Sequence, residues 1–176
     1  MDLMCVSQSS IYALYVSYFI AFGLGGFLSF PIMDKISRRQ AFFIFGTLHI
    51  LAQVMIIFLP FYWARFVGFT LMGLMCAKNS LCFTWLFELV DMRKKSIVSS
   101  AVNSLDFAIV IIAGIYYKFA SREWAPLILA FFWTCVCCFV LTGVLCPESP
   151  KWLLLQGRNR EAIESLNYIA KFNGCK

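Results

Sequence analysis

Long apolar segments separated by short polar stretches dominate the pattern of this chain. A helix needs about 20 largely apolar residues to cross a bilayer. Five segments have this character: 11–33, 41–59, 66–90, 97–117 and 125–146. They are apolar on all sides instead of alternating with period two, which favours helices over the strands of a membrane barrel. The pattern therefore predicts an all-α fold, a polytopic membrane helix bundle with five transmembrane helices.

A short helix is predicted directly after the last apolar segment. Ser149 is a good helix N-cap, and Pro150 suits the first helical position because it lacks an N–H group. Gly157 can end this helix in a left-handed conformation. The membrane segment would thus lead straight into a short helix outside the bilayer.

A second helix, amphipathic in pattern, is predicted from about Asn159 to Phe172, and Gly174 would stop it. Its apolar residues recur at helical spacing on one face. They are Ala162, Ile163, Leu166, Ile169 and Ala170. This face either lies on lipid headgroups or docks against the inner ends of the spans. The predicted organisation is a five-span bundle over residues 1–146 and a cytoplasmic linker over 147–176 that carries both helices.

Composition excludes a water-soluble fold. Hydrophobic residues make up 61% of the 176 residues and charged residues 14%, whereas soluble domains are roughly 45–50% apolar and about 25% charged. The net charge of +6 forms no basic stripe with interleaved aromatics, so no nucleic-acid partner is expected. Most of the eight cysteines fall within apolar segments and lack metal-ligand spacing, so neither a metal nor another cofactor is expected.

Basic residues alternate between the two sides of the predicted bundle. The first loop, the third loop and the tail hold eleven lysines and arginines, and the opposite side holds three. The positive-inside rule places the richer side in the cytoplasm or on an equivalent inner face. The N-terminus is then outside and the C-terminus inside, as an odd number of spans requires.

Several polar residues lie inside the apolar segments. Lys78 and Asn79 are in the third, Asp106 is in the fourth, and His49 and Gln53 are four apart in the second, on one helix face. A charge at mid-membrane costs at least about 2.5–3.5 kcal/mol, so such residues face protein or water. Lys78 and Asp106 either line a cavity that binds a solute, form a buried ion pair, or point in unrelated directions. His49 by itself is more typical of a hydrogen bond to a neighbour than of a proton relay. No nucleophile, metal or phosphate-loop constellation indicates an enzyme.

The tail carries the most specific motif of the chain. The run Pro147-Glu148-Ser149-Pro150-Lys151-Trp152-Leu153-Leu154, followed by Gly157-Arg158, resembles the segment after the sixth span of major facilitator superfamily transporters. The organic-ion and sugar-porter branches are the most similar. Lys151 stands where those branches usually have Arg, which keeps the charge but loses the bidentate geometry. The first loop, with Asp34-Lys35 and Arg38-Arg39, resembles the signature between the family's second and third spans.

The resemblance implies an inner-face charge network that holds one state of the carrier and breaks during alternation. Its implied members are Asp34, Arg38, Arg39, Glu88, Arg93, Glu148 and Lys151. Read without the family, these residues are charges near helix ends whose pairing contributes modestly to stability. Phe30 and Ser37 occupy positions where the family usually has glycine, and the bulky Phe30 is the more serious departure.

The register of the resemblance matches the five segments to the family's second through sixth spans. Nothing corresponds to the first span or to the second half. In this superfamily a small organic solute binds near the midplane between two halves. The chain is thus expected to be a partial N-terminal half of an alternating-access carrier, and the 176 residues alone are expected not to transport. The alternative is a transport-inactive subunit in a larger membrane complex. Expected partners are the lipid bilayer, a small organic ion or sugar, and the missing half, a second copy or a larger complex.

Overall fold

Helices make up nearly all of the computed structural model, which describes residues 7–174 except 76 and 121–122; the side chains of residues 29, 30, 32–34 and 77–80 are also not described. No strand occurs among the described residues. The elements are α1 (Gln8–Lys35), α2 (Arg38–Phe58), α3 (Tyr62–Leu74), α4 (Ala77–Leu89), the 3₁₀ turn η2 (Met92–Lys94), α5 (Lys95–Phe119), α6 (Ala125–Leu145), α7 (Pro150–Leu155) and α8 (Asn159–Phe172).

Four stretches are long and apolar enough to cross a membrane: Gln8–Leu28, Arg38–Phe58, Met92–Phe119 and Ala125–Leu145. They coincide with four of the five predicted spans, which confirms a polytopic helical membrane bundle. The predicted span 66–90 differs, because it forms two helices of 13 residues each, α3 and α4. A 13-residue helix is about 20 Å long, too short to cross the hydrocarbon core alone. Five continuous spans are therefore not found among the described residues.

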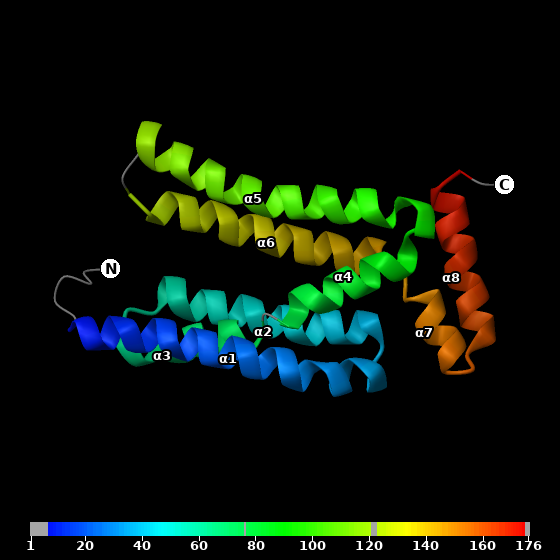
Figure 1. The fold of residues 1–176 in the computed structure, drawn as a ribbon, viewed down its shortest axis with the longest axis horizontal. Helices are drawn as coiled ribbons and strands as arrows, with labels where there is room; N and C mark the ends of the chain where they lie inside the picture. The colour runs from blue at the N-terminus through cyan, green and yellow to red at the C-terminus, as the bar shows by residue number, and fades with distance from the viewer. Residues whose placement is uncertain (1–6, 76, 121–122, 175–176) are drawn as a thin grey trace.

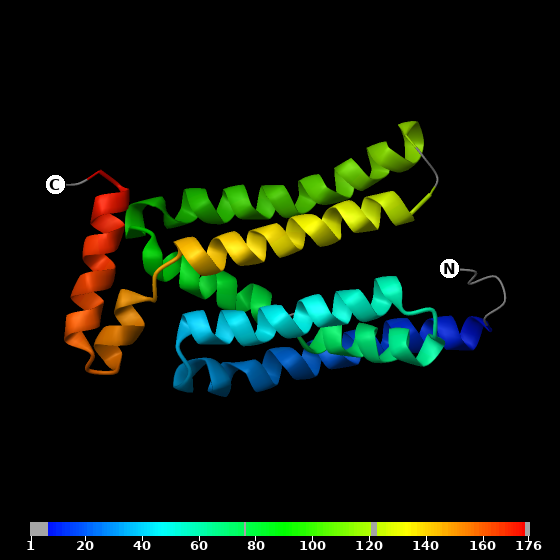
Figure 2. The same ribbon diagram turned by 180° about the vertical axis from the view of Figure 1, so that it is seen from behind.

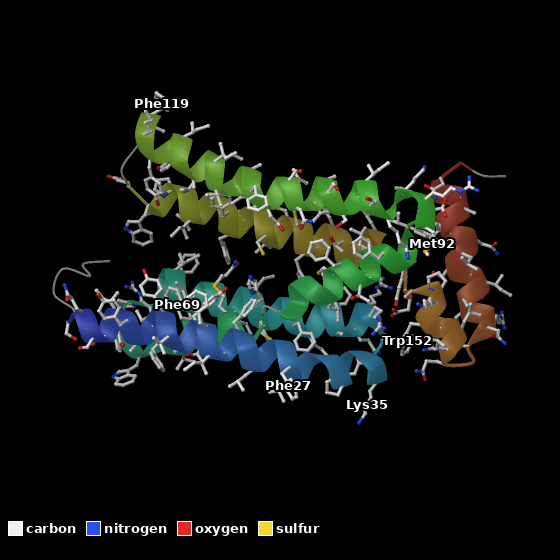
Figure 3. The ribbon with its side chains drawn as sticks, in the orientation of Figure 1. Phe27, Lys35, Phe69, Met92, Phe119 and Trp152 are labelled. Atoms are coloured by element: carbon white, nitrogen blue, oxygen red, sulfur yellow. The ribbon has the colours of Figure 1, made fainter. Side chains whose placement is uncertain are left out.

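The two short helices nevertheless follow one another along the bundle. Figure 1 shows α3 beginning at the end near the N-terminus and α4 continuing toward the end where α7 and α8 lie. Seen from behind, the order is the same (Figure 2). Together α3 and α4 run from one end of the bundle to the other, with an interruption between them. In Figure 3, Lys35, Met92 and Trp152 lie at one end and Phe119 at the other, so the basic loops and the tail share an end.

Close helix approach holds α1 against α3. Gly25 of α1 lies directly on the backbone of Leu74, and Gly73 lies on the backbone carbonyl of Tyr18, so a Cβ at either glycine would overlap main-chain atoms. Small residues are the usual means of such approach in membranes, where lipid tails compete with any apolar side chain. Gly25 and Gly73 thus allow α1 and α3 to pack in backbone contact.

An aromatic cluster joins α2, α4 and α6. The Phe42 ring stacks on Phe139 with centroids 5.2 Å apart and lies 5.4 Å from Trp85. Phe42, Leu81 and Trp85 are buried there. By contrast, α5 contributes no buried residue. The core thus lies among α1, α2, α3, α4 and α6, and the side chains of α5 are left largely uncovered by the other helices.

The tail helices begin and end as the sequence predicts. The Trp152 N–H donates to the Ser149 hydroxyl over 3.2 Å, which caps α7, and Pro150 follows at the first turn. Gly157 has a φ of 72°, and the Arg158 N–H donates to the Leu153 carbonyl over 3.0 Å, the bond that closes a glycine-terminated helix. The range of α8 is the predicted one.

Of the two interpretations of α8, docking is observed. Ala162 is fully buried in a cluster with Trp152 and Leu153 of α7. The Ser165 hydroxyl donates to the Glu148 carbonyl over 2.7 Å, and the Tyr168 hydroxyl donates to the Leu145 carbonyl over 3.2 Å. Both views show α7 and α8 lying across one end of the bundle (Figures 1 and 2).

Candidate functional site: the charge cluster at one end of the bundle

Glu148 closes the first turn of α2. The Arg39 N–H donates to the Glu148 carboxylate, 3.3 Å from one oxygen and 3.4 Å from the other. The next N–H, that of Gln40, donates to the Ser37 hydroxyl over 3.1 Å. The first N–H groups of a helix have no partner within the helix and carry its positive dipole end, so a carboxylate there is favourable. The loop after α6 is thereby joined to the start of α2.

The side chain of Arg39 makes a second connection between the same elements. Its guanidinium donates to the Gly143 carbonyl in α6 over 2.8 Å and lies 5.9 Å from the centre of the Phe43 ring. A Cβ at Gly143 would overlap the Phe43 ring, so the glycine allows this close contact. Arg39 therefore holds α2 to α6 through its side chain and to the loop after α6 through its backbone.

Arg38 connects α2 to α4 instead. Its Nε lies 3.5 Å from the Glu88 carboxylate, and the two side chains are 11% and 12% exposed. An ion pair this shielded is screened less than a surface pair, and removal of one partner leaves a poorly solvated charge. Arg38 and Arg39, adjacent in sequence, thus anchor one helix start to two different neighbours.

The remaining implied members of the network are less closely involved. Arg93 and Lys151 are exposed and form no ion pair within 4.0 Å among the described residues. Lys151 does line a charged cavity of about 520 Å³ together with Glu88, Asp91 and Lys95. The side chain of Asp34 is outside the described part of the structure. Four of the seven implied residues are therefore brought together as two contacts, Arg38 with Glu88 and Arg39 with Glu148.

Two members of this cluster were not foreseen. The Trp85 indole N–H donates to the Pro147 carbonyl over 3.1 Å and fixes the loop that carries Glu148. Ser37, which replaces a family glycine, is 6% exposed and caps α2. A serine just before a helical segment is an N-cap signal, so Ser37 was recognisable from sequence. The Trp85 bond spans 62 positions and had no local signal.

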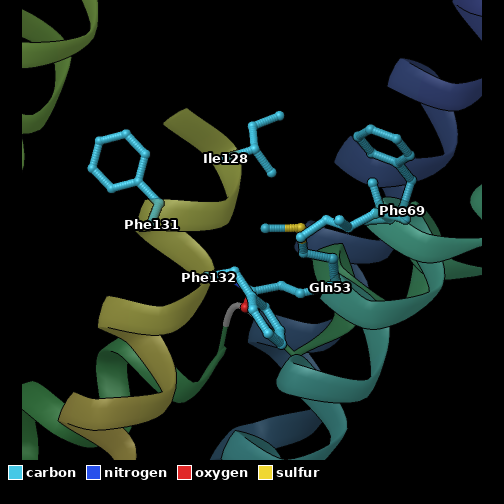
Figure 4. Close-up of a pocket in the computed structure, with 8 residues that line it drawn as sticks. Gln53, Phe69, Ile128, Phe131 and Phe132 are labelled. Carbon is cyan, nitrogen blue, oxygen red and sulfur yellow. The ribbon is translucent and has the colours of Figure 1, made fainter. Parts of the chain in front are cut away.

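A second polar group lies inside the bundle. The side-chain nitrogens of His49 and Gln53 are 3.3 Å apart, which confirms the shared helix face. Gln53 lines a largely apolar cavity of about 240 Å³ with residues of α3 and α6. Figure 4 shows Gln53 and Phe132 on facing walls of this cavity. The Gln53 side-chain oxygen is buried and has no hydrogen-bond partner among the described residues.

Asp106 is exposed on α5, the long helix without buried residues. Lys78 and Asn79, the other mid-membrane polar residues, have side chains outside the described part of the structure. A pairing of Lys78 with Asp106 therefore stays a prediction.

Comparison with known proteins defines the class. A bundle of apolar helices with charged contacts at one end suits a multi-pass membrane protein. The family model "Sugar (and other) transporter" matches residues 3–174. The chain belongs to this family and is an integral, multi-pass membrane protein.

Individual relatives are similar over most of the chain. A beta-alanine transporter of Drosophila melanogaster is 32% identical over 169 residues, which is 89% of this chain and 26% of that protein. Solute carrier family 22 member 21 of Mus musculus is 27% identical, with 89% and 28% covered. The human organic cation/carnitine transporter 2 is also 27% identical, with the same coverage. The chain thus spans about a quarter of the length of these relatives.

Proposed function

We propose that this chain is part of an alternating-access carrier for a small organic solute with a cationic group. Membership of a transporter family supports the general activity. The observation that carries the specific proposal is Asp106, an acidic residue exposed on a membrane-length helix that buries nothing in this chain.

The physical argument concerns the cost of a charge inside the bilayer. Burial of an aspartate at the centre of a span costs several kcal/mol, and membrane proteins place such residues toward water or protein. Ser99, Asn103 and Asp106 recur at spacings of four and three, so they share one face of α5. In the proposal this face borders a water-filled path, and the carboxylate attracts a solute cation.

The named solutes of the relatives are consistent with this chemistry. They are beta-alanine for one relative and organic cations and carnitine for another. Beta-alanine carries an ammonium and a carboxylate at neutral pH. We propose a solute of this zwitterionic or cationic kind, with Asp106 facing its ammonium and Lys78 facing its carboxylate.

The inner-face contacts would form the gate. Arg38 with Glu88 and Arg39 with Glu148 join α2 to α4 and to the loop after α6. In the proposal these contacts hold one state of the carrier and break in the other, with residues 1–146 in the membrane, the N-terminus outside and the tail 147–176 inside. Antibody access to an epitope tag after Phe172, before and after permeabilisation of cells, tests the orientation; staining of intact cells would contradict it.

Uptake through a hybrid carrier tests the proposed activity. Residues 3–174 would replace the matching segment of the beta-alanine transporter, and labelled beta-alanine entering vesicles would be measured. We expect saturable uptake by the hybrid and none by the 176-residue chain alone, because alternating access needs two halves. A folded hybrid that binds and moves no solute would contradict the proposal and favour a transport-inactive membrane subunit.

A further inference from the structure

The apolar flank of α8, defined here as Ile163 and Leu166, is not used in docking. The two side chains are 57% and 50% exposed. Ala162, which faces α7, is fully buried. At about 100° per residue, Leu166 lies about 40° and Ile163 about 100° around the helix from Ala162. The apolar face of α8 is thus wider than the face that docks.

The depth of α8 is set by its connection to a spanning helix. The Tyr168 hydroxyl donates to the carbonyl of Leu145, the last residue of α6. The candidate span that ends at Leu145 has 21 residues, about the number needed to cross the hydrocarbon core, so we place Leu145 close to the boundary between acyl chains and headgroups. Tyr168 therefore holds α8 within one side-chain length of that boundary, where tyrosine is itself favoured.

The direction of α8 also suits a helix that lies at the boundary between acyl chains and headgroups. It lies across the end of the bundle, at a steep angle to the long helices (Figure 1), and therefore roughly parallel to the membrane plane. The side opposite the docked face carries Arg160, Glu164 and Lys171, about 160–200° from Ala162. This order of docked face, apolar flank and charged face is that of a helix lying in a lipid interface.

From these observations we infer that Ile163 and Leu166 insert into the phospholipid interface of the inner leaflet, so that α8 anchors the tail to the membrane as well as to the bundle. The docked face fixes α8 to α7 and to the end of α6, and the flank fixes it to the surrounding lipid. This anchor concerns no solute and stands independently of the proposed transport.

Lipid-specific fluorescence quenching tests the anchor. An environment-sensitive fluorescent amino acid would replace Ile163, Leu166 or, as a control on the charged face, Glu164, in the full chain within lipid nanodiscs. Phospholipids brominated near the top of the acyl chain report contact with lipid, and acrylamide reports contact with water. All three positions are exposed, so the variants should fold, and circular dichroism checks this.

We expect brominated lipid to quench positions 163 and 166 at least about threefold more than position 164, and acrylamide to show the reverse order. Two results would overturn the inference. Strong acrylamide quenching at all three positions would place the flank in water. Weak quenching of positions 163 and 166 by both reagents would mean that protein, such as a second copy of the chain, covers them.

Discussion

The carboxylate of Glu148 accepts a backbone hydrogen bond from Arg39, so that a residue just past the last spanning helix caps the first turn of α2. The contact joins positions 109 apart in sequence. It makes the tail motif part of the bundle and explains why the acidic residue stands immediately before the Ser149 cap. The consequences for stability can be measured.

Replacement of Glu148 by alanine should lower the free energy of unfolding by about 1–3 kcal/mol, because two-centred acceptance by a charged group is lost at a helix start. Glu148→Gln keeps one oxygen acceptor and should lose less. Arg93→Ala, at an exposed residue outside the observed contacts, is the matched control. Chemical unfolding in detergent, followed by circular dichroism, measures all three. Equal stability of the alanine variants at 148 and 93 would contradict the capping role.

The ion pair of Arg38 and Glu88 should couple more strongly than a surface pair. A double-mutant cycle with Arg38→Ala and Glu88→Ala should give an interaction of about 1–3 kcal/mol, because both side chains are shielded. Arg158 and Glu161, both 49% exposed, provide the comparison. Their coupling should be within about 0.2–1 kcal/mol. Equal couplings in the two cycles would mean that the Arg38–Glu88 pair is as hydrated as the surface pair.

Two glycines of α1 provide a test of helix packing. Gly25→Ala should destabilise the bundle by about 1–3 kcal/mol or more, because its Cβ would overlap the backbone of Leu74, which cannot move aside. Gly23→Ala has open space around the new methyl group and should be neutral or stabilising by up to about 1 kcal/mol. Thermal unfolding in detergent compares the two. Similar midpoints would show that α1 does not pack on α3 as described.

Local signals in the sequence predict the tail well and the third span poorly. Ser149, Pro150 and Gly157 act on their immediate neighbours and delimit α7, and Gly174 likewise marks the end of α8, so both tail helices could be delimited before any contact was known. The break between Leu74 and Ala77 contains no proline, and segment 66–90 is apolar enough as a whole to be predicted as one span. The only local hints are Gly73 before the break and the polar run Lys78-Asn79-Ser80 after it. The close approach of Gly25 to Leu74, at the end of α3, is a tertiary feature that periodicity does not reveal.

The charge cluster likewise has one part that the sequence predicts and another that depends on tertiary contacts. The resemblance supplied the residue types of the charge cluster, and the structure determines which of them meet. Arg39 reaches the Gly143 carbonyl and not only a carboxylate, and Trp85 binds the Pro147 carbonyl. Both acceptors are backbone groups, whose availability depends on where α6 ends and not on any side chain in the sequence.

Lys78 provides a test of the solute's charge. In the hybrid carrier, Lys78→Ala should weaken uptake of beta-alanine more than uptake of a simple organic cation, because only the zwitterion has a carboxylate for the lysine to face. Lys78→Arg keeps the charge and should retain part of the preference. Unchanged relative uptake of the two solutes in Lys78→Ala would remove this residue from the proposed path.

The most direct test of the central claim is uptake of a labelled organic cation by the hybrid carrier with Asp106 changed. Asp106→Asn removes the charge at nearly constant volume, whereas Asp106→Glu retains it. If the exposed carboxylate on α5 borders the solute path, Asp106→Asn should reduce kcat/KM by at least about tenfold, an effect of about 1.4 kcal/mol, and Asp106→Glu should lose much less. Equal kcat/KM for the unmodified, Asn and Glu carriers at matched expression would contradict the account.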